Sequence, residues 1–594
     1  MAPDEADFAP ALFLPFPPFA AGVKSVSMTI LETSRETGAT PDAPVDTLFI
    51  AVAQLNPIVG DVAGNLDLAR RTSAGARDAG ADLVVFPELF IAGYPPEDLV
   101  LKPAFQQACR AAIETLAAET ADGPALLIGA PWVEEGRLYN SVLLLEDGGI
   151  SAVRHKVDLP NYGVFDEKRV FTPGPLPGPI PFKGVRLGVP VCEDIWGADV
   201  VECLAETGAE LLIVPNGSPY RQSVYAEREN VAVARVVESH LPLLYVNQVG
   251  GQDELVFDGA SFALNPDRFL ALQFPGFMER VRISKWQRFE NGWKCLGANL
   301  ADRIEGDEAD YAACVLGLRD YVNKNRFPGV VLGLSGGIDS AICAAMAVDA
   351  LGPERVHCIM LPYRYTSDES LTDAAAVAQA LGVRYDIVPI ATGVEGMEAA
   401  LAPLFEGTQR DVTEENLQSR VRGALLMSVS NKFGAMVVTT GNKSEMSTGY
   451  ATLYGDMNGG YNPIKDLYKT QVTRLSRLRN RWKPAEALGP DGIVIPDSLI
   501  DKPPTAELRE NQKDQDSLPP YAVLDAILER LVEREHSVAQ IIAEGFDAAT
   551  VTRVERLLNI AEYKRRQAAP GVKVTGRNFG RDRRYPITNR FREG

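Results

Sequence analysis

The chain has 594 residues, which is enough for two or three α/β domains with large hydrophobic cores. Its formal net charge of −20 argues against a nucleic-acid-binding surface, which would need a basic footprint. Seven scattered cysteines without a C-x-x-C pair predict a reduced, cytoplasmic chain that has neither a disulfide framework nor a zinc site.

Residues 1–46 carry an apolar stretch at 11–19 that prolines interrupt. Three acidic residues precede this stretch, whereas a secretory signal begins with positive charge. We therefore expect a flexible N-terminal extension over 1–46, with Met28 as an alternative start of the chain. No apolar run approaches the roughly 18 residues of a membrane helix, so we expect no membrane partner.

Strands and amphipathic segments alternate over residues 47–285, which we expect to form the first domain. Such alternation favours parallel strands packed between helices. Residues 286–305 are mixed and polar, and we expect them to link this domain to a second domain over 306–594. The strands of the first domain are expected at 48–54, 83–86, 125–128, 141–145, 185–189, 211–214 and 243–246.

Three chemically active side chains each follow an apolar run of the first domain: Glu88, Lys156 and Cys192. We expect them near one edge of a sheet, where α/β proteins keep their sites. A carboxylate can take the proton of a thiol, and a buried ammonium can stabilise the thiolate and an oxyanion. The set therefore predicts thiol-based acyl transfer without histidine, in a chain that has only four histidines.

Considered one at a time, these three residues have simpler interpretations. A glutamate can be a loop charge, a lysine can extend to solvent, and a buried cysteine can pack as a small apolar residue. Together they resemble the nitrilase (carbon–nitrogen hydrolase) family, whose Glu-Lys-Cys triad occurs in the same contexts. Further matches are Gly-Tyr-Pro-Pro-Glu-Asp-Leu at 93–99, Leu-Pro-Asn-Tyr-Gly-Val-Phe-Asp-Glu at 159–167 and Asn-Gly-Ser-Pro-Tyr at 216–220.

The resemblance implies an α-β-β-α sandwich with glutaminase activity. It implies that Glu88 is the general base, Cys192 the nucleophile and Lys156 the electrostatic stabiliser. It also implies that Tyr162 and Ser218 bind glutamine.

One position departs from the pattern of the family. Glutaminase members usually carry Lys or Arg six residues beyond the serine, where this chain has Val224. Arg221 and Arg228 are the nearby candidates for the missing contact with the substrate carboxylate.

A glycine-rich segment lies near the start of the second domain, between an apolar run at 328–332 and a helix at 341–348. Glycines let the backbone approach phosphate oxygens, and a helix start points N–H groups at them. Asp339 suits such a site if a magnesium ion lies between it and the phosphates. The simpler alternative is an ordinary strand–turn–helix without a ligand. The segment comprises Gly333, Leu334, Ser335, Gly336, Gly337, Ile338, Asp339 and Ser340.

This segment lacks the lysine of a kinase or GTPase loop. It resembles the SGGxDS pyrophosphate loop of the ATP pyrophosphatase superfamily. Those enzymes adenylate a carbonyl oxygen and release pyrophosphate.

Further polar residues follow in the second domain. Glu445 comes after a strand expected at 435–439 and would give magnesium a second hard oxygen ligand beside Asp339. Lys469 could offset the charge that builds on leaving pyrophosphate. Polar residues at 416–422 share a helical face, for which a solvated surface is the simpler interpretation. We also expect a helix at 311–325, strands at 355–361 and 384–389, and a long functional loop at 484–518.

In this order the features resemble the ammonia-using NAD synthetase domain over nearly all of 306–594. The resemblance implies a Rossmann-like parallel sheet of the adenine nucleotide α-hydrolase type. It implies that residues 333–340, Thr440 and Lys469 bind ATP and that Asp339 and Glu445 hold Mg²⁺. The residues implied for deamido-NAD are Asn416, Arg420, Glu445, Asp456 and Lys564.

A nitrilase-type amidase fused to such a synthetase resembles the glutamine-dependent NAD synthetase family. The resemblance implies three small-molecule substrates, namely glutamine, deamido-NAD and ATP as co-substrate, and a homo-oligomer. Glutamine would supply ammonia, ATP would adenylate deamido-NAD with release of pyrophosphate, and ammonia would displace AMP to give NAD. One alternative is an amidase of other specificity fused to an ammonia-dependent NAD synthetase. Another is an assembly in which one domain is only a scaffold.

Overall fold

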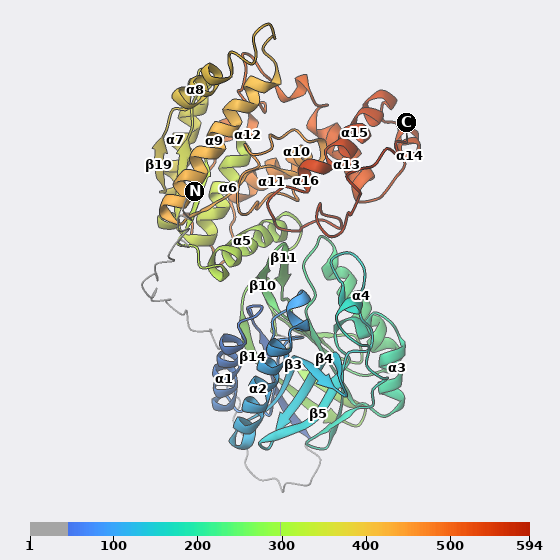
Figure 1. The fold of residues 1–594 in the computed structure, drawn as a ribbon. Helices are drawn as coiled ribbons and strands as arrows, with labels where there is room; N and C mark the ends of the chain where they lie inside the picture. Colours follow the sequence, from blue (N-terminus) through green and yellow to red (C-terminus); the bar gives the residue numbers. More distant parts are fainter. Residues whose placement is uncertain (1–45, 298, 594) are drawn as a thin grey trace, which may run out of the picture.

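The computed structural model describes residues 46–297 and 299–593, which form two lobes (Figure 1). The candidate start Met28 and nearly all of the expected N-terminal extension lie outside the described residues. Among the described residues, no helix is long and apolar enough to cross a membrane.

The first lobe contains two seven-stranded sheets. One runs in the order β15 (Gly292–Leu296), β14 (Arg280–Phe289), β1 (Thr47–Gln54), β2 (Leu83–Val85), β3 (Ala125–Glu134), β4 (Arg137–Glu146) and β5 (Gly149–His155). The other runs in the order β16 (Asn299–Leu300), β13 (Leu270–Gln273), β12 (Phe262–Leu264), β9 (Leu243–Asn247), β8 (Leu211–Asn216), β7 (Val185–Gly188) and β6 (Ile180–Phe182).

The two sheets pack face to face, and each carries helices on its outer face. In β1, Leu48, Ile50 and Val52 join the core between the sheets, while Ala51 and Ala53 join the core under the helices. This alternation arises because successive strand residues point to opposite faces, and both faces of β1 are covered. The helices α1 (Val62–Asp78) and α2 (Pro103–Glu119) cover one sheet; α3 (Asp199–Glu206) and α4 (Val224–Ser239) cover the other. The expected α-β-β-α sandwich is confirmed.

The expected linker at 286–305 is wrong over most of its length, because residues 286–296 belong to the first sheet and 299–300 form β16 of the second. The strand β14 pairs antiparallel with β1, and Trp286 lies opposite Leu48. The side chains of Trp286 and Trp293 are fully buried in the core between the sheets. Polar residues alternate with these aromatic ones, so the average composition concealed a strand that is buried on one face.

The second lobe is built on a parallel four-stranded sheet in the order β19 (Arg384–Ile387), β18 (Val356–Met360), β17 (Val330–Gly333) and β20 (Met436–Val437). The helices α5 (Gly306–Lys324), α6 (Ile338–Leu351) and α7 (Asp368–Leu381) pack into one core with this sheet. The helices α8 (Ala391–Leu401) and α9 (Val412–Phe433) pack on its other side. The expected Rossmann-like class is confirmed.

The C-terminal part of the second lobe is mainly helical. It contains α10 (Lys443–Thr448), α11 (Lys469–Arg479), α12 (Asp497–Asp501), α13 (Tyr521–Val532), α14 (Val538–Ala543), α15 (Ala548–Ile560) and α16 (Glu562–Arg565). The expected long loop at 484–518 is irregular apart from α12 and one short 3-10 turn.

The two lobes share a hydrophobic core where they meet. The hairpin of β10 (Val249–Gln252) and β11 (Leu255–Asp258) projects from the first lobe onto α5 (Figure 1). Val249, Val256 and Phe277 pack in the same cluster as the apolar residues of α5. The carboxylate of Asp320 on α5 accepts hydrogen bonds from Asn56 Nδ2 and Gly251 N, both at 2.7 Å. The lobes are therefore joined by packing as well as by the chain.

Candidate active sites

The three reactive residues of the first lobe converge at the ends of both sheets. Glu88 and Lys156 follow β2 and β5 of one sheet, whereas Cys192 follows β7 of the other. Lys156 Nζ lies 2.7 Å from Glu88 Oε1, and both side chains are fully buried. Cys192 lies close enough to both that Glu88 raises its pKa and Lys156 lowers it, in addition to the larger effect of burial. The expectation of a single sheet edge is therefore wrong, because the sandwich brings two edges together.

The expected nucleophile, Cys192, occupies a strained turn. Cys192 begins a short 3-10 helix, Cys192–Ile195, with a φ of 48°, which is unusual for a residue other than glycine. Backbone strain of this kind persists only where surrounding structure enforces it, and it concentrates at functional sites.

Asp194 supplies that enforcement. Its carboxylate accepts hydrogen bonds from the backbone N–H groups of Val191, Val157 and Asp158 at 2.9, 3.0 and 2.7 Å. One side chain thus fixes the turn of Cys192 against the segment that carries Lys156. Burial raises the pKa of Asp194 to about 7, against the opposing effect of these N–H groups.

Two further buried residues that the sequence analysis did not single out complete the centre. Glu167 Oε1 accepts hydrogen bonds from Lys156 Nζ at 2.9 Å and from the hydroxyl of Tyr94 at 2.7 Å. Asn140 Nδ2 donates to Glu88 Oε1 at 2.7 Å. Glu167 is the last residue of the motif at 159–167. Its acidic side chain within that motif was the sequence feature that could have identified it.

The electrostatics of the centre favour a neutral thiol at rest. Burial, and then the negative charge of Glu88, raise the pKa of Cys192 well above its ordinary value, while Lys156 opposes them. Burial alone would lower the pKa of Lys156, but Glu167 and Glu88 raise it well above the ordinary value. The lysine is therefore charged, and Glu88 is placed to take a proton when the thiol attacks.

The rim of this centre carries an acidic side chain. The hydroxyl of Tyr162 donates to Glu193 Oε1 at 2.9 Å, and the ring of Tyr162 is half exposed. Among the described residues, Glu193 has no basic side chain as an ion-pair partner. Burial raises the pKa of Glu193. A cationic group of a substrate would complement it.

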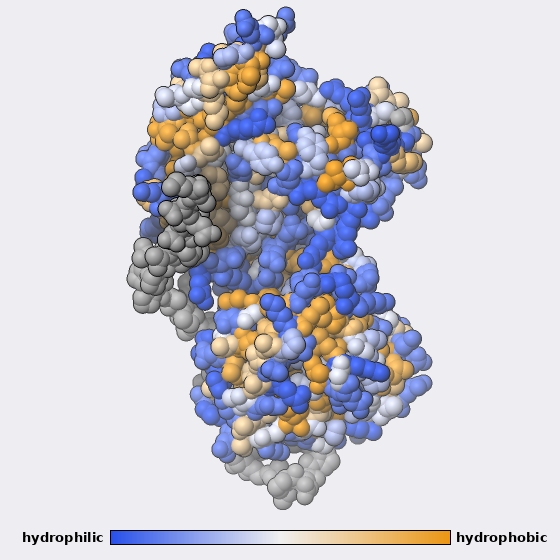
Figure 2. Space-filling view, in the orientation of Figure 1, coloured by the Kyte–Doolittle hydropathy of each residue, from blue (hydrophilic) through white to orange (hydrophobic). Residues whose placement is uncertain are grey.

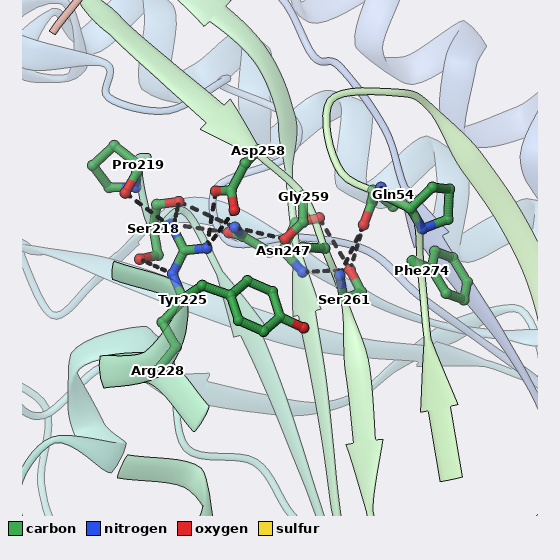
Figure 3. A network of polar contacts seen from close by, with 12 residues as sticks. Gln54, Ser218, Pro219, Tyr225, Arg228, Asn247, Asp258, Gly259, Ser261 and Phe274 are labelled. Carbon is green, nitrogen blue, oxygen red and sulfur yellow. Dashed lines mark hydrogen bonds and ion pairs between the residues drawn. The ribbon is translucent and has the colours of Figure 1, made fainter. Parts of the chain in front are cut away.

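Ser218 is held by a buried arginine (Figure 3). Arg228 on α4 donates from Nε to Ser218 Oγ at 2.9 Å and from Nη2 to the carbonyl oxygens of Ser218 and Pro219. Its Nη1 forms an ion pair with Asp258 at 2.9 Å. Asn247 adds two hydrogen bonds to the Ser218 backbone. Ser218 is thereby fixed in position.

Neither candidate for the substrate carboxylate is free. Arg228 is consumed by the contacts above, and Arg221 is paired with Glu227 through both guanidinium arms. Val224 is buried in the core that the lobes share. The interpretation of Arg228 as a substitute for the missing cation is therefore wrong, because its charge is already neutralised by Asp258.

The second lobe contains a cleft that holds the glycine-rich segment. All eight residues of 333–340 line it, as do Thr440, Glu445, Asp456 and Lys469. Gly336 has a φ of +76°, and an added Cβ would lie 2.3 Å from the carbonyl oxygen of Ser370. A side chain is therefore excluded there. Ser340 Oγ accepts a hydrogen bond from Ser335 N at 3.2 Å, which shapes the turn before α6.

One lysine joins the two expected metal ligands. Lys469 Nζ forms an ion pair with Asp339 and lies 3.9 Å from Glu445 Oε1. Asn442 Nδ2 donates to the other oxygen of Asp339 at 3.0 Å. Burial, and then the charge of Asp339, raise the pKa of Glu445 well above its ordinary value. Two neighbouring carboxylates thus share one ammonium, an arrangement that fits a divalent cation between them and a phosphate.

The expected deamido-NAD residues divide into two groups. Glu445 and Asp456 line the cleft, whereas Asn416, Arg420 and Lys564 do not. These three instead contact the segment that ends at Asp456: Asn416 accepts from Thr452 Oγ1, Arg420 donates to Leu453 O, and Lys564 donates to Gly449 O and Ala451 O.

The long loop supplies cleft residues that the sequence analysis did not assign. Glu507 accepts hydrogen bonds from the hydroxyls of Ser367 and Ser370 at 2.7 and 2.9 Å, at the start of α7. Lys502, Glu507 and Asp514 all line the cleft. Only the description of 484–518 as a functional loop pointed to them.

The fold and the two sites define a class: an amidase of the nitrilase type joined to an ATP-using synthetase. The carbon-nitrogen hydrolase family matches residues 49–287, and the NAD synthase family matches residues 310–568. The chain belongs to the glutamine-dependent NAD(+) synthetase family.

Individual relatives cover nearly the whole of both chains. The glutamine-dependent NAD(+) synthetase of Rhodobacter capsulatus is 55% identical over 92% of this chain and 99% of its own. That of Thermotoga maritima is 42% identical over 92% of this chain and 99% of its own. The solved Acinetobacter baumannii enzyme, in complex with adenosine diphosphate, has a TM-score of 0.73 and 42% identity, covering 91% of this chain and 99% of its own.

Proposed function

We propose that this protein makes NAD from deamido-NAD, ATP and glutamine. We assign glutamine hydrolysis to the first lobe, which ends with β16, and NAD formation to the lobe of 306–593. The observation that carries the proposal is the buried Glu88, Lys156 and Cys192 centre in one lobe that is packed directly on the lobe with the phosphate-loop cleft.

In the first lobe, Cys192 Sγ attacks the amide carbon of glutamine as Glu88 takes the thiol proton. The charged Lys156 stabilises the thiolate and the developing oxyanion. Glu88 returns the proton to the leaving nitrogen. Ammonia then departs and leaves the glutamyl group bound to Cys192 as a thioester. Water, activated by Glu88, then releases glutamate and restores the thiol.

Glutamine is supported as the amide by the rim of the centre. A glutamine zwitterion carries an α-ammonium group, which complements the Glu193 carboxylate that Tyr162 orients. Ser218, held by Arg228, offers a second polar contact.

In the second lobe, the carboxylate of deamido-NAD attacks the α-phosphorus of ATP, and pyrophosphate leaves. The N–H groups of residues 333–340 and the ammonium of Lys469 bind the phosphates. Asp339 and Glu445 would hold Mg²⁺, which supplies charge neutralisation for the leaving pyrophosphate. Among the described residues no three His, Cys, Asp or Glu side chains converge on a metal, so phosphate oxygens would complete its shell. Ammonia then displaces AMP to give the nicotinamide.

The fusion has a chemical reason. Ammonia is mostly protonated at neutral pH, and ammonium has no lone pair with which to attack. Release inside the protein delivers it in the reactive form.

We also propose a cytoplasmic homo-oligomer. The described cysteines are all free, as a reducing compartment would keep them. Apolar surface is visible over α8 and α9 in the second lobe (Figure 2). The exposed apolar side chains of these helices include Met397 and Phe433. Exposed apolar surface of this kind favours burial against a second copy. Analytical ultracentrifugation of the wild type and of Phe433→Glu tests this: a monomeric wild type would contradict it.

The decisive experiment measures NAD formed from deamido-NAD and ATP with glutamine or ammonium as donor. The wild type should use both, and Cys192→Ala should use only ammonium. The alternative, an amidase of other specificity, remains open because Arg221 and Arg228 are engaged elsewhere. Activity of the wild type with ammonium alone would favour that alternative.

A further inference from the structure

The segment 216–220 carries part of the glutaminase centre. Gly217 follows β8, and its N–H donates to Glu88 Oε2 at 2.9 Å. An added Cβ at Gly217 would lie 2.8 Å from the ring of Tyr94, so the backbone has little freedom to shift on that side. Burial is the main cause that raises the pKa of Cys192, and the backbone of Gly217 acts in the opposite direction. The placement of this segment therefore sets the geometry of both the base and the nucleophile.

Ser218 and Pro219 of this segment are held within their own lobe, by the contacts with Arg228 and Asn247 that Figure 3 shows. Its last residue is held from across the lobe boundary. The hydroxyl of Tyr220 donates to Oδ1 of Asp310 at 2.7 Å, and both side chains are buried. The ring of Tyr220 packs edge-on against Phe277 at 5.3 Å.

Asp310 lies near the start of α5 in the synthetase lobe. Its other oxygen accepts hydrogen bonds from Gln222 at 2.7 Å and from Gln471 at 2.6 Å. Among the described residues no basic side chain is paired with this carboxylate. A buried carboxylate without a cation depends on its hydrogen bonds, so its three donors are strongly localised.

The donors of Asp310 come from both catalytic regions. Tyr220 is the last residue of segment 216–220, and Gln222 lies two residues further on. Gln471 lies two residues after Lys469, which is paired with Asp339 of the phosphate loop. Gly217 and Lys469 are thus connected through the Asp310 carboxylate, with residues 218–220 on one side of it and residues 470–471 on the other.

We propose that Asp310 is a positioning residue that the synthetase lobe contributes to the glutaminase centre, acting through the hydroxyl of Tyr220. It touches neither substrate nor reacting atoms; it holds segment 216–220 so that Gly217 N faces Glu88 and Cys192. This inference rests on the proposed glutaminase function and adds that the amidase lobe alone does not define its own active geometry.

The alternative is that Asp310 only stabilises the contact between the two lobes. In that case, loss of Asp310 would lower the stability of the folded protein and would reduce both activities equally. A positioning role separates them, because the phosphate-loop cleft retains its own contacts when the Tyr220 hydroxyl is removed.

The experiment compares four variants of the full chain, in glutamate release from glutamine and in NAD formation with ammonium. Tyr220→Phe removes one hydroxyl, Asp310→Ala removes the acceptor, and Asp310→Asn keeps an acceptor oxygen for the hydroxyl. Asp307→Asn is the matched control, because Asp307 lies three residues earlier on α5 but is partly exposed and pairs with Arg474.

Tyr220→Phe and Asp310→Ala should lower kcat for glutamine hydrolysis at least about tenfold, since small misplacements of reacting groups have such effects. NAD formation with ammonium should stay within about twofold, and Asp310→Asn should recover most of the lost kcat. Wild-type kcat in Tyr220→Phe, or an equal fall of both activities, would overturn the inference alone. A wild type that releases no glutamate would overturn the proposed function itself.

Discussion

Lys156 Nζ lies 2.7 Å from Glu88 Oε1 and 2.9 Å from Glu167 Oε1, so one buried ammonium serves two buried carboxylates. If both carboxylates are ionised they outnumber the single ammonium, and a cysteine thiolate would add a further negative charge. The proton of the thiol therefore has to pass to Glu88 rather than leave the site.

The titration of Cys192 should respond to Glu88. Because burial and then Glu88 raise the pKa of Cys192, Glu88→Gln should shift the titration midpoint to lower pH, and Lys156→Met should shift it to higher pH. Alkylation of the Cys192 peptide by iodoacetamide across pH, followed by mass spectrometry, measures this. Cys203, which is partly exposed, is the internal control. A midpoint that rises in Glu88→Gln would contradict the assignment of Glu88 as the neighbouring negative charge.

Glu167→Gln should lower kcat for glutamine hydrolysis at least about tenfold, because Lys156 loses one of its two orienting carboxylates. The Tyr94 hydroxyl keeps an acceptor in this variant, so the packing is preserved. Asp166→Asn is the control, since Asp166 pairs with Arg169 near the surface. Equal activities of the two variants would show that Glu167 is dispensable.

Lys469→Met should lower NAD formation with ammonium by about two orders of magnitude, as loss of a charge on a leaving phosphate group does. Glutamine hydrolysis should persist, because the thiol centre lies in the other lobe. Arg474→Gln, an exposed change on the same helix, should behave as wild type. Full NAD formation in Lys469→Met would remove this lysine from the phosphate site.

Trp286→Ala should lower the free energy of unfolding by about 3–5 kcal/mol, the usual effect of deleting a buried large aromatic side chain. Its indole N–H donates to Ser284 Oγ at 2.9 Å, which adds to the loss. Phe289→Ala in the same strand, where the ring is half exposed, should have a much smaller effect. Urea unfolding of both variants decides between a core strand and a linker at this position.

Asp194 should make the stability depend on pH. Its folded pKa of about 7 exceeds the ordinary value of about 3.9 for the unfolded chain. The folded state then binds the proton more tightly, so stability should fall as pH rises from about 4 to about 7. Asp194→Asn should show a shallower dependence in urea midpoints measured across that range. An unchanged slope would mean that the carboxylate is ionised throughout.

The residues that act through their own chemistry could be found from the sequence. Glu88, Lys156 and Cys192 each follow an apolar run, and the residues of 333–340 form a contiguous motif. Both patterns are local in the chain, so no knowledge of tertiary contacts was required.

Residues that act by holding others could not be found in this way. Asp194 works through backbone groups some 36 positions away, and Asp310 through a tyrosine 90 positions away. Such partners become visible only when the sheets and lobes have packed. Trp286 was missed for a related reason, because the strand that pairs with β14 is the first of the domain.

The core that α5 shares with the β10–β11 hairpin limits how this gene can be divided. A chain ending before residue 306 would leave Val249, Val256 and Phe277 facing water, and a chain beginning there would uncover one side of α5. Two units that resemble separable domains therefore depend on each other to bury this core. A recombination event that replaced one lobe with that of a distant homologue would have to preserve the packing of this shared core as well as the active sites.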